Sequence, residues 1–101
     1  MITEFQKRRD YLVGAINKID GISCPTPGGA FYVYVDVSKT GLSGEGFAAL
    51  LLKSGVGVIP GTAFGNSGQS FVRISYASSM EILQKAMQRI ETAVVEHMKN
   101  R

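Results

Sequence analysis

The alternating segment at residues 30–37, AFYVYVDV, constrains the fold more than any other part of the chain. Its β-branched and aromatic residues predict a strand whose side chains point to two faces in turn. One face carries Phe31, Val33, Val35 and Val37, and the other carries Ala30, Tyr32, Tyr34 and Asp36. The segment FVRISYA at 71–77 predicts another strand of the same kind. Its faces carry Val72, Ile74 and Tyr76 on one side and Phe71, Arg73 and Ser75 on the other.

Helical periodicity surrounds these strands. A helix is predicted over residues 3–19, begun by a capping box of Thr3 and Gln6, and a short one over 43–54, begun by Ser43. A short strand is predicted at 56–60, and a last helix begins at SSME with Ser78 and Glu81 as its capping box. The expected inner faces are Phe5, Leu12, Ile16 and Ile19; Phe47, Leu50 and Leu51; and Leu83, Ala86, Met87, Ile90 and Val94.

The order α-β-α-β-β-α predicts an α/β (α+β) two-layer sandwich with a three-stranded, largely antiparallel sheet covered on one face by helices. The 101 residues suit one domain, residues 1–101. Helices of this length cover one sheet face only. The other face is expected to expose Tyr32, Tyr34, Phe71 and Arg73, an unusual surface to leave in water.

Charge and composition argue against several classes of function. The net charge is +3, but the basic residues gather at the two ends, KRR at 7–9 and KNR at 99–101. Since they form no stripe interleaved with aromatics, no nucleic-acid partner is expected. No apolar run is long enough for a membrane span, and the first residues do not resemble a signal peptide. A single cysteine, Cys24, rules out an internal disulfide and favours a cytoplasmic location.

Arg73 is the candidate binding residue. Strand spacing allows a surface arginine laid over Tyr32 or Tyr34, or paired with Asp36 across the strands. It equally allows an anion receiver, because a guanidinium offers two parallel donors that match a carboxylate. Spacing alone does not choose between these possibilities.

Five segments in order carry a family resemblance: FQKRRD at 5–10, DGISCPTPGGAFYVYVDV at 20–37, GVGVIPGTAFG at 55–65, FVRISYA at 71–77 and SMEILQKAMQRI at 79–90. Together they resemble the C-terminal small domain of the class I pyridoxal-phosphate-dependent aminotransferases, the aspartate aminotransferase-like branch. The family patterns are G-x-x-x-x-P-x-G-A-F-Y, V-x-x-x-P-G-x-x-F-G and R-x-S-[FY]-A. The resemblance covers nearly the whole chain.

The resemblance implies that Arg73 binds the α-carboxylate of an amino-acid or 2-oxo-acid substrate, and that Gly29 lines the substrate cleft. It also implies that pyridoxal 5'-phosphate is held by a large domain that this chain lacks, and that the full-length protein is a homodimer. This chain alone is expected to bind no cofactor and to be inactive. The identity of the amino-group donor does not follow.

Three further residues are candidate reactive groups. SKTGLSGEGF superficially resembles the cofactor-lysine motif, but Lys39 follows the first strand and Gly44 is not followed by the required arginine. Lys39 is therefore expected to be a loop lysine. His97 is expected to complement the dipole of the last helix, and Cys24 to be a packing residue, since no histidine is near it in sequence.

Two other functions stay open from the residues alone. One is a free-standing amino-acid-binding regulatory module, which needs a complete pocket of its own. The other is an interaction domain that uses the uncovered sheet face for a protein partner.

Overall fold

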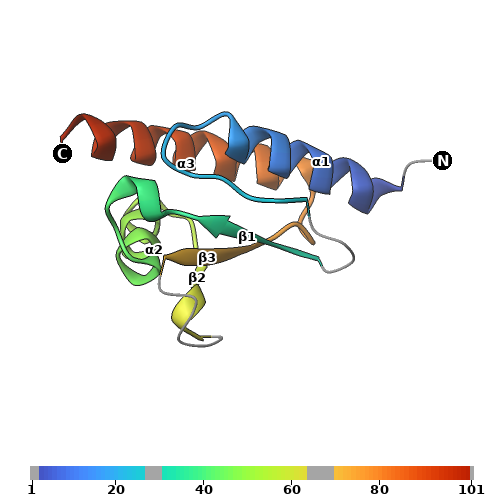
Figure 1. Cartoon of the computed structure of the whole chain (residues 1–101). Helices are drawn as coiled ribbons and strands as arrows, with labels where there is room; N and C mark the ends of the chain where they lie inside the picture. The colour runs from blue at the N-terminus through green and yellow to red at the C-terminus, as the bar shows by residue number, and fades with distance from the viewer. Residues whose placement is uncertain (1–2, 27–30, 64–69, 101) are drawn as a thin grey trace.

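A three-stranded antiparallel sheet forms one layer of the molecule, and two long helices form the other (Figure 1). The computed structural model describes residues 3–26, 31–63 and 70–100. Along the chain the elements are α1 (Glu4–Asn17), β1 (Tyr32–Asp36), the 3-10 turn η1 (Ser38–Thr40), α2 (Gly44–Lys53), β2 (Ile59–Pro60), the 3-10 turn η2 (Gly61–Ala63), β3 (Phe71–Ser75) and α3 (Met80–Lys99). The predicted α-β-α-β-β-α order and two-layer class are confirmed, with two short turns added.

The sheet order is β1-β3-β2, so the strand that carries Arg73 lies in the centre. β3 pairs antiparallel with both neighbours, with Tyr34 opposite Arg73 on one side and Ile59 opposite Arg73 on the other. The predicted alternation holds in both long strands, since Val33, Val35, Val72 and Ile74 are buried.

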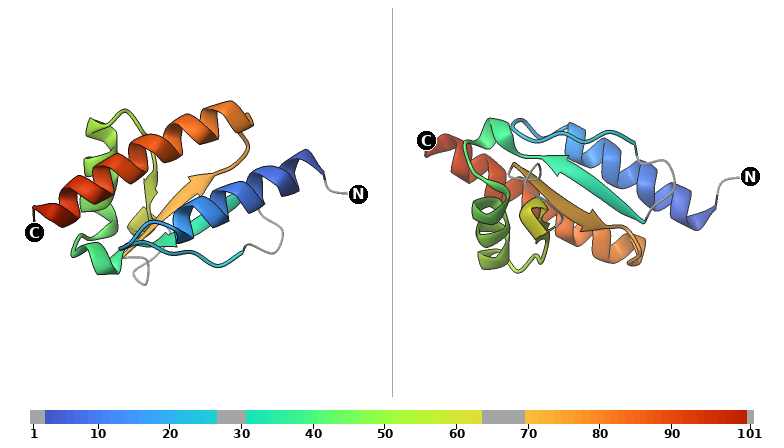
Figure 2. Two further views of the ribbon diagram at one scale, coloured as in Figure 1. Left: turned by 90° about the horizontal axis from the view of Figure 1, so that it is seen from above. Right: turned by 60° about the horizontal axis from the view of Figure 1, so that its bottom comes forward.

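α1 and α3 lie side by side across one face of the sheet and run in the same direction (Figures 1 and 2). α2 lies at the β2 end, where it contacts β2, β3 and α3. The largest fully buried side chains come from all of these layers: Phe47, Leu12, Ile16, Leu51, Ile90, Val33, Val35, Val37, Val72 and Val94. Turning the lower side of the molecule forward shows the sheet in front of the helices, with its other face open (Figure 2, right).

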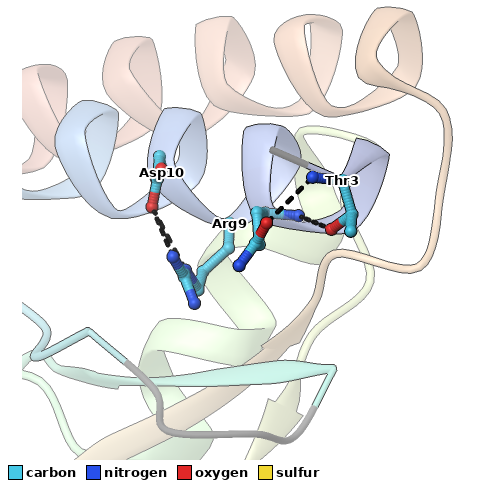
Figure 3. A network of polar contacts seen from close by, with 4 residues as sticks. Thr3, Arg9 and Asp10 are labelled. Carbon is cyan, nitrogen blue, oxygen red and sulfur yellow. Dashed lines mark hydrogen bonds and ion pairs between the residues drawn. The ribbon is translucent and has the colours of Figure 1, made fainter. Parts of the chain in front are cut away.

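The first helix begins with the predicted capping box (Figure 3). The hydroxyl of Thr3 accepts the Gln6 amide at 3.1 Å, and the Gln6 side chain accepts the Thr3 amide at 2.8 Å. The helix ends at Asn17, two residues earlier than predicted, and the chain turns at Gly21 with φ +106°. Ile19 is buried, but it lies beyond the helix.

The side chain of Asn17 fastens the loop after α1. Its amide nitrogen donates to the Cys24 carbonyl at 3.0 Å, and its oxygen accepts the Cys24 amide at 2.9 Å. The neighbouring Ser23 forms a two-bond bridge with Asp36 at the edge of β1. These contacts join the helix layer to the sheet before the first strand begins.

Replacing Asn17 by alanine is expected to lower the free energy of unfolding by about 1–2 kcal/mol, because two partly buried backbone groups of Cys24 lose their partners. Urea unfolding of the purified chain measures this free energy. Asn100, which follows α3 and is exposed, supplies the control. Its replacement by alanine is expected to change stability by less than about 0.5 kcal/mol. Equal effects of the two substitutions would contradict the role given to Asn17.

The predicted strand at 56–60 is wrong in length, since only Ile59–Pro60 pairs. The reason is the end of α2. Gly55 takes φ +82°, the amide of Val56 bonds to Leu51 O at 2.9 Å, and that of Gly55 to Leu52 O at 3.0 Å. This is a Schellman motif, which uses amides that a longer strand would need. Of the strand predicted at 30–37, β1 covers Tyr32–Asp36, Phe31 and Val37 lie outside it, and Ala30 lies outside the described residues.

The predicted capping box of Ser78 and Glu81 is wrong by one residue. Ser79 is the N-cap of α3, and its hydroxyl accepts the amide of Ile82 at 3.2 Å. The turn before the helix uses another serine, since the hydroxyl of Ser75 accepts the amide of Ala77. The helix therefore begins one residue later than its sequence pattern suggests.

Two aromatic residues assigned to inner faces are nearly half exposed. Phe5 is 43% exposed and Phe31 is 49% exposed. Their rings pack together with centroids 4.8 Å apart, and Phe31 also meets the edge of the buried Tyr76 at 6.3 Å. Arg8 lies over the ring of Phe5, with its guanidinium carbon 5.3 Å from the ring centroid. The pair thus forms the border of the core.

Within the described residues, none of the helices is both long enough and apolar enough to cross a membrane.

Candidate functional site: the uncovered sheet face

Arg73 lies on the uncovered face, at the centre of the sheet. Its neighbours along β3, Val72 and Ile74, point into the core, so strand alternation directs Arg73 away from the helices. Tyr34 and Ile59 lie opposite it on the two flanking strands and are 46% and 42% exposed. On this face, the cationic side chain of Arg73 therefore lies between a tyrosine and an isoleucine of the two flanking strands.

The guanidinium of Arg73 stacks on the ring of Tyr32. Its carbon lies 4.1 Å from the ring centroid, within the range of a cation–π contact. Of the placements that spacing allowed, the structure thus shows the arginine laid over Tyr32. A carbon this close to the centroid favours contact through the flat face of the guanidinium, and the N–H donors lie along the edge of that plane.

Asp36, the acidic residue of this face, is engaged by Ser38. One carboxylate oxygen accepts the Ser38 hydroxyl at 2.7 Å and the Ser38 amide at 2.9 Å. The hydroxyl bond and the amide bond from Ser38 lower the pKa of Asp36, burial opposes them, and the nearby charge of Lys39 adds a lesser lowering effect. A lowered pKa contributes stability above the ordinary pKa of the group, and that stability is lost as the pH falls through the folded-state value.

Gly29, the other predicted binding residue, lies outside the described residues, as does Gly28. The described chain resumes at Phe31, next to Tyr32 and the aromatic border. The structure therefore brings Arg73 together with Tyr32 and Tyr34, and the predicted role of Gly29 stays a prediction.

The three other candidates occupy structural positions. Lys39 lies in η1 directly after β1. Cys24 is buried, and burial raises the pKa of its thiol, which disfavours the reactive thiolate. His97 Nε2 lies 2.9 Å from the carbonyl oxygen of the buried Thr40. A carbonyl only accepts, so Nε2 donates and ties the end of α3 to η1.

No group of three or more His, Cys, Asp or Glu able to hold a metal ion occurs in residues 3–26, 31–63 and 70–100.

The feature that sequence reasoning did not select was Tyr32 as the specific partner of Arg73, since Tyr34 lies directly opposite in the ladder. The face assignment named both tyrosines, but the choice between them depends on side-chain rotamers.

The sequence of this chain matches a known protein family. The family model described as aminotransferase class I and II matches residues 1–90. The chain belongs to the class I and II aminotransferase family. Proteins of this family depend in general on pyridoxal phosphate.

Relatives and solved structures agree with the family. The chain is 50% identical over 95 residues to an aspartate aminotransferase of Pyrococcus horikoshii, covering 93% of this chain and 24% of the relative. A crystal structure of an aromatic aminotransferase from the same organism superimposes with a TM-score of 0.88 and 40% identity over 92% of this chain and 25% of that one. The structure of the aspartate aminotransferase of Thermus thermophilus with maleate superimposes with a TM-score of 0.81 and 38% identity. The match covers 89% of this chain and 23% of that one.

The chain thus spans about a quarter of the length of the relatives it matches. Lys39 does not fit the lysine of a pyridoxal phosphate site. The one lysine in a motif-like context, Lys39, lies in a 3-10 turn after β1, and Gly44, where the motif continues, begins α2.

Proposed function

We propose that this chain is the small, C-terminal domain of an aminotransferase that transfers an amino group between an amino acid and a 2-oxo acid. Three facts support the proposal: the family match over residues 1–90, relatives named aspartate aminotransferase, and coverage of about a quarter of their length. The remaining part of such a protein would supply the pyridoxal phosphate site and most of the homodimer contacts.

Arg73 is the proposed anchor for the α-carboxylate of the substrate. The observation that carries this role is its position on the central strand of the uncovered face. A strand paired on both sides fixes the direction of the side chain, and a guanidinium matches a carboxylate with two parallel donors. Every amino acid and 2-oxo acid carries this carboxylate, so one arginine can orient all of them.

The uncovered face is also the proposed contact with the large domain. Tyr32, Tyr34 and Ile59 are partly apolar and exposed there, and such a surface favours contact with another protein layer. Closure of that layer over the substrate would exclude water and bring Arg73 to the carboxylate. Gly29 is proposed to line the same cleft.

Adding pyridoxal phosphate to the isolated chain is expected to give neither the absorbance band of a protein-bound cofactor nor transfer of an amino group. The full-length protein is expected to show both. The reason is that the large domain is proposed to supply the cofactor site. Spectrophotometric titration and a coupled transaminase assay with amino acids and 2-oxo acids measure the two quantities.

Two results would contradict the proposal. Activity of the isolated chain with the cofactor would show that the cofactor site lies within it. Tight binding of free amino acids by the isolated chain would favour the regulatory module, because a partly exposed arginine alone binds a carboxylate only weakly in water.

A further inference from the structure

The ring of Tyr32 supports the side chain of Arg73 on the uncovered face. The guanidinium carbon lies 4.1 Å from the ring centroid. In the strand ladder Tyr32 is opposite Ser75, and Arg73 is opposite Tyr34. Tyr32 is therefore a diagonal neighbour of the arginine, at a separation that long and aromatic side chains can bridge.

This stack limits the freedom of a long side chain. An arginine on an open surface samples many rotamers, and ordering it when a ligand binds weakens affinity by roughly two- to ten-fold. An aromatic ring beneath the guanidinium removes part of that cost before the ligand arrives. The central strand holds the backbone, so the ring acts on the remaining side-chain rotation.

Stacking and carboxylate binding use different parts of the guanidinium. The 4.1 Å approach to the ring centroid favours contact through the flat face, whereas the N–H donors point outward in the plane of the guanidinium. A bidentate carboxylate approaches along that plane. The two contacts are therefore compatible, and the ring determines the plane in which the donors lie.

We propose that Tyr32 is a positioning residue that holds the guanidinium of Arg73 in the orientation for bidentate carboxylate binding. The inference rests on the proposed function, because it requires that Arg73 bind a carboxylate. The ring makes the contact, so phenylalanine at this position is expected to serve as well as tyrosine.

The test measures maleate binding and steady-state kinetics in the full-length protein with Tyr32→Leu and Tyr32→Phe. Phe31→Leu is the matched control: it removes the neighbouring ring, which packs against Phe5 and Tyr76 on the helix side of the sheet. Maleate is the probe because it is a non-reacting dicarboxylate.

Tyr32→Leu is expected to raise the Kd for maleate and the KM for the amino acid by roughly two- to ten-fold, with kcat nearly unchanged. Tyr32→Phe and Phe31→Leu are expected to leave the Kd within about two-fold of the unaltered value. Adding Tyr32→Leu to Arg73→Ala is expected to cause no further loss, because Tyr32 acts through Arg73.

Several results would overturn the inference. Equal losses for Tyr32→Leu and Tyr32→Phe would assign the effect to the hydroxyl, and an additional loss in the Arg73→Ala background would show direct contact between Tyr32 and the ligand. An effect of Arg73→Ala with none of Tyr32→Leu would reject the positioning role alone. No maleate binding, or binding unchanged by Arg73→Ala, would reject the proposed function itself.

Discussion

Arg73→Ala in the full-length protein is expected to lower kcat/KM for amino acids by between about 30-fold and a few thousand-fold. This range corresponds to the roughly 2–5 kcal/mol lost when one partner of a desolvated charge pair is removed. The physical reason is that the substrate carboxylate would lose its oriented donors and keep an unpaired charge. Steady-state kinetics with saturating cofactor measure the effect.

Two further variants make this result specific. Arg73→Lys keeps the charge but not the two parallel donors, so an intermediate loss is expected. Arg89→Ala removes an exposed arginine from α3, the helix on the other side of the sheet, and is expected to leave kcat/KM nearly unchanged. Unchanged kinetics in Arg73→Ala, or equal losses in Arg73→Ala and Arg89→Ala, would reject the carboxylate role.

Gly44→Ala is expected to lower the free energy of unfolding of the purified chain by about 2–3 kcal/mol, near the upper end of overpacking effects. Gly44 is buried at the first turn of α2, and a Cβ there would collide with the carbonyl oxygen of Phe71. Phe71 belongs to the central strand, whose backbone is held in the sheet ladder. Since neither backbone can move alone, the helix would have to shift away from the sheet.

Gly46→Ala is the matched control, two residues along the same helix. A Cβ there would lie 3.5 Å from the nearest atom, Leu42 Cδ2, an ordinary contact. Alanine is also the better helix former, by about 1 kcal/mol, so Gly46→Ala is expected to be neutral or stabilising. Urea unfolding with unchanged m values compares the two. Similar stability of both variants would contradict the close approach of α2 to β3.

The regular elements and their buried faces could be predicted from local patterns. Alternation selected Val33, Val35, Val72 and Ile74, and all are buried. The capping box at Thr3 also formed as predicted, because it depends on residues close together in the chain. At the start of α3, two adjacent serines could serve as the N-cap, and the structure uses Ser79 instead of Ser78. At 56–60, the amide of Val56 bonds to the end of α2 and is not available to a strand.

For the candidate site, the sequence predicted the face but not the contact. Alternation placed Arg73 opposite the helices, and the family resemblance supplied its expected role. The partner below the guanidinium was not predictable, because Tyr32 and Tyr34 share one face and rotamers decide which ring is reached. The resemblance therefore determined a residue, and the fold determined its orientation.

The sequence by itself determined the order of elements, the apolar faces and the strand that carries Arg73, because these follow from residue spacing within single segments. Only the tertiary structure decided that Asn17 fastens the Cys24 loop, that Gly44 touches the backbone of β3 and that Tyr32 supports Arg73. Each of these is a contact between segments separated along the chain, and its geometry depends on how the two layers pack.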